Sequence, residues 1–154
     1  MTQPSRAATW RSMLYVPPTV PRFVAKAPAS GADAIILDLE DSVPPAQKEE
    51  ARAGLAAAGL HRRGGGAAVL VRINRPLRMA VRDVEAAVAC GADGILVTKA
   101  MDAGHVRLIA EVLDDLEGAA PRAVLLPIVE SAAARRRHAL RCGGSGGRDR
   151  LHLG

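Results

Sequence analysis

The chain has 154 residues, of which 49% are hydrophobic, and a formal net charge of +5 at pH 7. This length suits one domain with a sizeable apolar core. Two cysteines are too few for a disulfide framework and lack metal-ligand spacing, and no apolar run approaches the ~20 residues of a membrane span. We therefore expect a cytoplasmic protein that makes no contact with a membrane.

The positive charge is concentrated near the carboxyl terminus. Residues 135–154 contain six arginines and one acid, Asp149, so they carry the whole excess of +5, and residues 1–134 are neutral. A nucleic-acid-binding domain would carry a basic face through its fold, often with stacking aromatic side chains. We therefore expect no nucleic-acid partner. Residues 1–10 are predicted to be an N-terminal extension of a domain over 11–154, in which 135–150 is an irregular Arg- and Gly-rich segment.

The first half of the chain alternates predicted strands and helices. Residues 13–16 are predicted to form a strand that two prolines end, and 20–30 to form a helix whose last turn is broken or kinked by Pro28. The apolar run 34–37 is predicted to be a buried strand. Two further prolines then begin a helix that continues to about residue 58.

The same alternation continues in the second half. Strands are predicted at 69–73, 94–97 and 123–128, and helices at 81–90 and from the capping residue Asp102 to Glu117. Beyond these elements, 131–140 is predicted to be helical and 151–153 to be one more short strand.

An internal repeat supports a parallel sheet. Gly31-Ala-Asp and Gly91-Ala-Asp each lie between a predicted helix and an apolar strand, and a glycine is the usual residue at a helix end. Repeated strand–helix units of about 30 residues are typical of βαβ crossovers.

Polar side chains follow the predicted strands at their carboxyl ends. In a (β/α) barrel these ends converge on one mouth, where active sites lie. The sequence therefore predicts an enzyme whose site draws on Asp38, Glu40, Asp41, Arg72, Asn74, Lys99 and Glu130.

Six ordered motifs resemble the citrate lyase β-subunit family of the HpcH/HpaI aldolase superfamily. They are Arg11-Ser-Met-Leu-Tyr-Val-Pro17, Pro21-Arg22 with Lys26-Ala27, Leu37-Asp-Leu-Glu-Asp41, Val71-Arg-Ile-Asn74, Thr98-Lys99 and Leu126-Pro-Ile-Val-Glu-Ser131. The resemblance implies an α/β fold, a partial (β/α)8 TIM barrel with about six of its eight βα units. It also implies a Mg²⁺-dependent carbon–carbon lyase that acts on a 3-hydroxyacyl-CoA such as citryl-, citramalyl- or malyl-CoA, and we expect a homo-oligomer.

The resemblance also implies roles for individual residues. Glu130 would be a metal ligand, and Arg72 would bind the reacting oxygens. The catalytic carboxylates Asp38, Glu40 and Asp41 would lie near the metal and its waters. The substrate-binding set would comprise Arg72, Arg22, Lys26, Asn74 and Lys99, with Arg22 and Lys26 toward the thioester or its phosphates. Oxygen ligands suit a hard divalent cation, which polarises the bond to be broken.

Structural alternatives exist for these residues. Asp38 or Asp41 could cap the following helix or pair with Lys48, Glu130 could interact with a helix dipole, and Arg72 could simply balance the carboxylates. The four histidines show no pairing pattern and are expected at the surface.

The resemblance weakens after Ser131 and returns at residues 151–154, just before the position of the family's second metal carboxylate. The sequence is therefore interpreted as a truncated or frame-altered family member, or as a fragment of one. Two alternatives are a catalytically inactive remnant that acts as a binding or assembly partner, and a doubly wound α/β domain.

Overall fold

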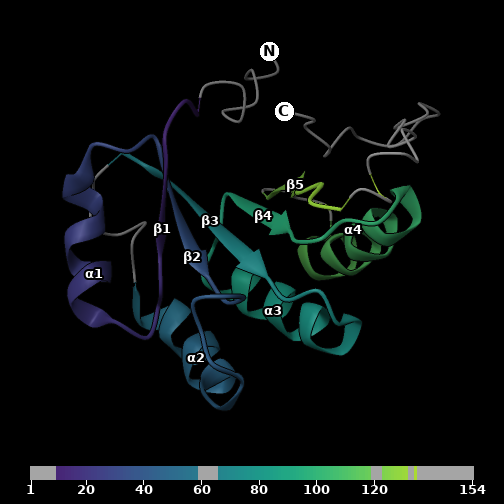
Figure 1. The fold of residues 1–154 in the computed structure, drawn as a ribbon, viewed down its shortest axis with the longest axis horizontal. Helices are drawn as coiled ribbons and strands as arrows, with labels where there is room; N and C mark the ends of the chain where they lie inside the picture. Colours follow the sequence, from purple (N-terminus) through teal and green to yellow (C-terminus); the bar gives the residue numbers. More distant parts are fainter. Residues whose placement is uncertain (1–9, 59–65, 119–122, 132–133, 135–154) are drawn as a thin grey trace.

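The computed structural model describes residues 10–58, 66–118, 123–131 and 134. Its centre is a five-stranded parallel sheet in which each strand pairs with the next one along the chain (Figure 1). The strands are β1 (Met13–Val16), β2 (Ala34–Asp38), β3 (Ala68–Ile73), β4 (Gly94–Val97) and β5 (Val124–Pro127).

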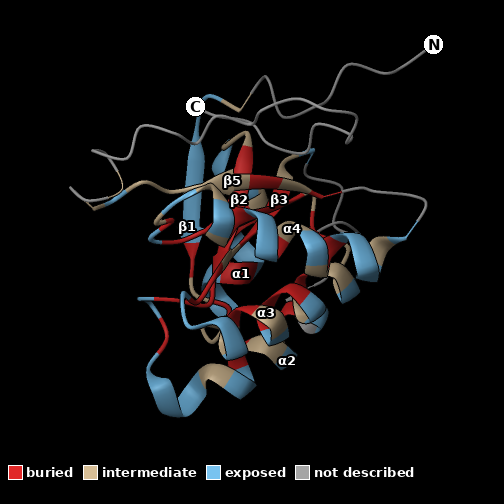
Figure 2. Ribbon diagram, turned by 90° about the vertical axis from the view of Figure 1, so that its right-hand side faces the viewer, coloured by how far each residue is buried: buried red, intermediate tan, exposed pale blue. Residues whose placement is uncertain are grey.

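The helices connect successive strands and cover one face of the sheet (Figure 2). Neighbouring helices in the chain contact one another, α1 with α2, α2 with α3 and α3 with α4. The helical elements are α1 (Pro21–Lys26), the 3-10 turns η2 (Ala27–Ser30) and η3 (Pro45–Gln47), α2 (Lys48–Ala58), α3 (Leu77–Ala89) and α4 (Ala103–Glu117).

This arrangement is that of a (β/α) barrel. A doubly wound sheet reverses its strand order at one point and places helices on both faces, whereas the order here is sequential and the helices lie on one side. The doubly wound alternative is therefore wrong. The structure describes five strands; the sixth, predicted at 151–153, lies outside the described residues, as does nearly all of the helix predicted at 131–140.

The sheet separates two apolar clusters. Alternate strand residues, such as Ile35 and Val71, pack with the helices in the larger one. The residues between them form a smaller cluster on the opposite face, which would be the inside of the barrel; its buried members are Ala34, Ile36, Leu70 and Leu96. Because side chains alternate along a strand, Asp38 follows Ala34 and Ile36 onto the inner face, and the β2–β3 register places it opposite Arg72.

Several sequence predictions are confirmed, and the start of one helix differs by several residues. Pro28 indeed ends the regular helix, and the chain continues as η2. Gly31 and Gly91 both adopt left-handed conformations, with φ of 75° and 76°, which glycine takes without strain. The helix predicted at 81–90 begins earlier, at Leu77, because Pro76 occupies its N-cap position and Ala80 packs into the core. No described helix is both long and apolar enough to span a membrane.

Candidate functional site

The segment 38–42, called here the carboxylate loop, begins at Asp38, the last residue of β2. The Asp38 carboxylate accepts hydrogen bonds from the backbone N–H of Glu40 (2.9 Å) and of Ser42 (3.1 Å). The Ser42 hydroxyl in turn donates to the Asp38 carbonyl (3.1 Å). Asp38 therefore closes its own turn rather than capping the helix that follows.

Arg72 and Asp38 form a bidentate ion pair across adjacent strands. Nε of Arg72 lies 2.7 Å from Oδ1 and Nη2 lies 2.6 Å from Oδ2. The exposed fractions of the two side chains are only 14% and 2%. Burial would raise the pKa of Asp38, but hydrogen bonds from Arg72, Ser42 and the Glu40 N–H outweigh it and hold that pKa below its usual value. The same pairing raises the pKa of Arg72.

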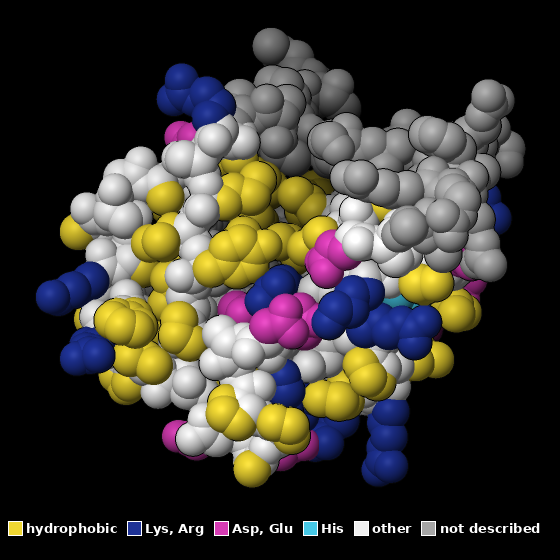
Figure 3. Space-filling view, viewed as in Figure 1, with side chains coloured by type: hydrophobic (Ala, Val, Ile, Leu, Met, Phe, Trp, Pro, Cys, Tyr) yellow, Lys and Arg dark blue, Asp and Glu magenta, His cyan; other side chains and the backbone are white. Residues whose placement is uncertain are grey.

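Glu40 and Lys99 extend this ion pair. Oε1 of Glu40 lies 2.5 Å from Nζ of Lys99, and Oε2 lies 3.2 Å from Nη1 of Arg72. Asp41 is more exposed, at 3.6 Å from Arg72 and 3.8 Å from Lys99. We call Asp38, Glu40, Asp41, Arg72 and Lys99 the Arg72 cluster. In Figure 3, acidic and basic side chains gather near the centre of the face, below a group of hydrophobic side chains.

Lys99 has an unusual backbone. Its φ of 49° is the only positive value among the non-glycine residues that the structure describes, and such conformations concentrate at functional sites. The hydrogen bond to Glu40 raises the pKa of Lys99, so its ammonium stays charged at neutral pH. The sequence predicted that Lys99 lies at the carboxyl end of β4, but it did not predict the positive φ of its backbone.

Tyr15 belongs to the site and was missed by the sequence analysis. Its ring centroid lies 4.9 Å from Cζ of Arg72, which is a cation–π distance. The alternation of side chains along β1 could have identified Tyr15, because it places Tyr15 on the inner face of the sheet with Asp38 and Arg72. The Tyr15 ring therefore packs against the same guanidinium that binds Asp38 through Nε and Nη2.

The Tyr15 phenol is expected to ionise above pH 10. Burial is the main cause of its raised pKa; the positive charge of Arg72 opposes it, and the negative charges of Asp38, Glu130 and Glu40 add to it. Since the folded chain favours the neutral phenol, the stability that this preference contributes is present below pH 10 and is lost as the pH rises through the folded pKa. The chain has one tyrosine, so absorbance at alkaline pH measures this pKa directly, with the urea-unfolded chain as reference. Equal midpoints in the two states would contradict the prediction.

A pocket of about 620 Å³ lies beside the carboxylate loop. Asn74 lines it, but the amide nitrogen of Asn74 already donates to the Leu39 carbonyl (2.9 Å) and to Asp83 (2.7 Å). To bind substrate through its amide nitrogen, as predicted, Asn74 would have to give up one of these two hydrogen bonds within the protein. The charged residues that line the pocket are Glu40, Asp41, Lys48, Arg75 and Lys99.

Glu130 lies after β5 and is exposed. Its charge contributes to the raised pKa of Tyr15 and of Lys99, which places it within electrostatic range of the Arg72 cluster. The structure thus brings the predicted metal ligand to the same end of the sheet. Within the ranges that the structure describes, no three side chains of His, Cys, Asp or Glu are already grouped to hold a metal ion.

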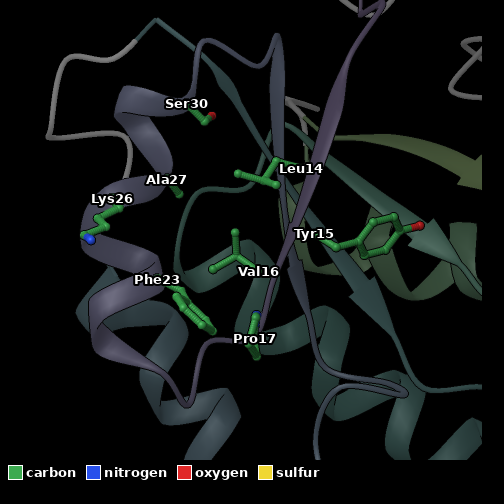
Figure 4. Close-up of a pocket in the computed structure, with 8 residues that line it drawn as sticks. All are labelled: Leu14, Tyr15, Val16, Pro17, Phe23, Lys26, Ala27 and Ser30. Carbon is green, nitrogen blue, oxygen red and sulfur yellow. The ribbon is translucent and has the colours of Figure 1, made fainter.

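Arg22 and Lys26 lie elsewhere. Lys26 lines a separate pocket of about 380 Å³ between β1 and α1, and in Figure 4 Tyr15 points away from it, to the other side of β1. The Arg22 guanidinium lies 4.9 Å from the Phe23 ring. The structure therefore does not bring these two predicted substrate-binding residues into the Arg72 cluster.

His105 also differs from expectation. It is half-buried rather than at the surface, and its Nδ1 is buried without a hydrogen-bond partner among the described residues. Burial, aided by the nearby charge of Arg75, lowers the pKa of His105. The other three histidines lie outside the described residues.

Curated proteins are similar to this chain in sequence. The chain is 36% identical over 112 residues to the (3S)-malyl-CoA thioesterase of Cereibacter sphaeroides, covering 72% of this chain and 39% of that protein. It is 34% identical over 137 residues to the L-malyl-CoA/beta-methylmalyl-CoA lyase of Rhodobacter capsulatus, covering 84% and 43%. The chain thus spans about two fifths of the length of these curated relatives.

Solved structures agree with the sequence comparison. The citrate lyase beta subunit of M. tuberculosis, complexed with oxaloacetate and magnesium, superposes with a TM-score of 0.62 at 32% identity, covering 84% of this chain and 52% of that one. The family model described as HpcH/HpaI aldolase/citrate lyase matches residues 11–137. This match spans all five strands of the sheet and every residue of the Arg72 cluster, so the chain belongs to the HpcH/HpaI aldolase/citrate lyase family.

Proposed function

We propose that this chain supplies part of the active site of a Mg²⁺-dependent carbon–carbon lyase that acts on a 3-hydroxyacyl-CoA of the citryl, citramalyl or malyl type. The observation that carries the proposal is the bidentate Arg72–Asp38 pair, with Glu40 and Lys99 beside it, on the inner face of a barrel at the carboxyl ends of its strands. We propose this activity for a complete barrel, because the chain spans about two fifths of the length of its curated relatives.

The residues present fit a magnesium ion. Mg²⁺ takes oxygen ligands and keeps several waters, and the acids of the Arg72 cluster, together with Glu130, offer carboxylate oxygens. Oε2 of Glu40 is buried without a hydrogen bond among the described residues, although Nη1 of Arg72 is 3.2 Å away. A water or a substrate oxygen beside this pair would hydrogen-bond to both atoms. Glu130 would hold the ion, and the bound ion would polarise the substrate oxygens beside the bond to be cleaved.

The geometry gives each residue of the Arg72 cluster a different role. Asp38 is fully engaged by Arg72 and by the loop backbone, so it orients the guanidinium and is not the base. Nη1 of Arg72 makes no hydrogen bond to Asp38, which takes Nε and Nη2, so it would donate to a developing oxyanion beside Glu40. Oε2 of Glu40, which has no hydrogen bond, would accept the proton of the substrate hydroxyl. Lys99 would compensate the charge of Glu40.

A thioester hydrolase acting on the same substrates is the second candidate, since one relative is a malyl-CoA thioesterase. The two activities differ in their products. Carbon–carbon cleavage of malyl-CoA yields acetyl-CoA and glyoxylate, whereas hydrolysis consumes water and releases malate and the free thiol of CoA. Release of free thiol without glyoxylate would favour the hydrolase. The inactive-remnant alternative receives no support from the relatives, which are enzymes.

Two further expectations stay predictions. The first is a cytoplasmic location. The second is a homo-oligomer.

Glu130→Gln is expected to abolish most of the Mg²⁺ binding of the chain, because it removes a charged oxygen ligand while it keeps the side-chain size. Isothermal titration calorimetry with MgCl₂ is the measurement. The matched control is Glu111→Gln, an exposed glutamate on α4, which should bind like the unmodified chain. Equal binding by both variants would remove Glu130 from the metal site.

A further inference from the structure

Asp83 is a completely buried carboxylate on the helix side of the sheet. It lies on α3 among the apolar residues Ala80, Val84 and Ala87, with an exposed fraction of 0%. Burying a charge is costly unless it is fully paired. Here Oδ1 accepts from Nε of Arg52 (2.6 Å), and Oδ2 accepts both the backbone N–H and the side-chain amide of Asn74 (2.7 Å each). An apolar side chain would fill this place at lower cost, so the carboxylate calls for another explanation.

Asn74 connects this buried charge to the carboxylate loop. Its side-chain amide also donates to the Leu39 carbonyl at 2.9 Å. The orientation of the amide is determined by its partners, because the reverse orientation would place the Asn74 carbonyl oxygen against two acceptors. Asp83 therefore holds Asn74 in the position from which Asn74 binds the loop backbone.

Lys48 binds the same stretch of backbone from α2. Its ammonium donates to the Leu39 carbonyl at 2.7 Å and to the Glu40 carbonyl at 2.6 Å. Two consecutive carbonyl groups of the carboxylate loop are thus bound by two side chains: Asn74, which directly follows β3, and Lys48, at the start of α2. One of these carbonyls belongs to the residue after Asp38 and the other to Glu40, and both of these acids pair with Arg72.

We propose that Asp83 and Lys48 are positioning residues of the candidate site. Asp83 acts through Asn74, and Lys48 acts directly, to fix the Leu39 and Glu40 carbonyls; this directs Asp38 onto Arg72 and the Glu40 carboxylate toward the pocket. The consequence for turnover rests on the proposed function, whereas the effect on the loop does not. Neither residue has to touch the substrate.

Hydrogen exchange of the unmodified chain and of Asp83→Asn, without metal or substrate, tests this proposal. The reporters are the amides of Glu40 and Ser42, which donate to Asp38; mass spectrometry with fragmentation to single residues resolves them. The references are the amides of Ala34 and Ala68 at the opposite end of the strands. We expect exchange at Glu40 and Ser42 to accelerate by about tenfold or more relative to the references.

Asp93→Asn is the matched control, because the Asp93 carboxylate also accepts a backbone N–H of β3, that of Val69 (2.8 Å), but at the amino end of the sheet. It should leave the two reporters unchanged relative to the rest of the sheet. Equal acceleration at reporters and references in Asp83→Asn would make Asp83 a purely structural residue and overturn its part of the proposal.

Lys48→Met provides a second and independent measurement in case Asp83→Asn does not fold. Lys48 is only partly buried, so its loss should not unfold the chain, yet it removes both carbonyl contacts. Faster exchange at the Glu40 and Ser42 amides supports the proposal, and unchanged exchange there overturns it for Lys48. Because no turnover is measured, failure of the lyase assignment would not affect either result.

Discussion

Arg72→Met is expected to lower the free energy of unfolding by about 3–5 kcal/mol, since breaking a buried ion pair leaves an uncompensated charge. The remaining charge is the Asp38 carboxylate, whose side chain is 2% exposed and which would lose both hydrogen bonds from the guanidinium. Glu40 would also lose the positive charge 3.2 Å from its Oε2. Methionine keeps much of the length of the arginine side chain. The loss of stability would therefore result from removal of the positive charge and its hydrogen bonds rather than from lost packing.

Urea unfolding followed by circular dichroism is the measurement. Arg82→Met is the matched control, because Arg82 also pairs with a carboxylate, that of Glu49, but the two side chains are 51% and 63% exposed. Exposed pairs contribute about 0–1 kcal/mol. Adding Asp38→Asn to Arg72→Met should recover part of the lost stability by removing the buried charge. Similar losses in Arg72→Met and Arg82→Met would show that the Arg72–Asp38 pair contributes little to stability.

Arg72→Lys is expected to reduce lyase turnover by about 10²-fold or more, the usual effect of removing one oxyanion-stabilising donor. Lysine keeps the positive charge but cannot bind Asp38 through two parallel N–H groups while it offers a further N–H to the substrate. It would also lose the planar contact with the Tyr15 ring. The change should therefore appear in kcat more than in the binding of Mg²⁺.

The measurement needs a complete barrel, because the chain covers only 43% of the L-malyl-CoA/beta-methylmalyl-CoA lyase of Rhodobacter capsulatus. We would join residues 11–131 to the remaining strands of that relative and assay glyoxylate formation from malyl-CoA. Arg82→Lys in the same chimera should be neutral. Unchanged turnover in Arg72→Lys would reduce Arg72 to a structural partner of Asp38, although the stability prediction above would still hold.

The sequence by itself determined the class of the fold. Short apolar runs such as 34–37 and 94–97, each preceded by a glycine that ends a helix, predict buried parallel strands, and the structure confirms them at Ala34–Asp38 and Gly94–Val97. Local patterns are informative here because a strand buried on both faces and a glycine in a left-handed conformation are both properties of a few adjacent residues. The gathering of acids and bases at the strand ends follows from the same patterns, since parallel strands end on one side.

Only the tertiary structure decided which of these polar residues meet. The ion pair between Asp38 and Arg72 depends on the register of β2 against β3, and the contact of Tyr15 with Arg72 depends on β1 joining the same sheet. The apolar pattern of a strand determines which side chains face the core, but which strand it pairs with, and at which residues, depends on packing between segments far apart in the chain. For the same reason the role of Asp83, a single acid in an amphipathic helix, could not be predicted. Only the structure shows that Lys26 lines a pocket between β1 and α1, on the other side of β1 from the Tyr15 ring.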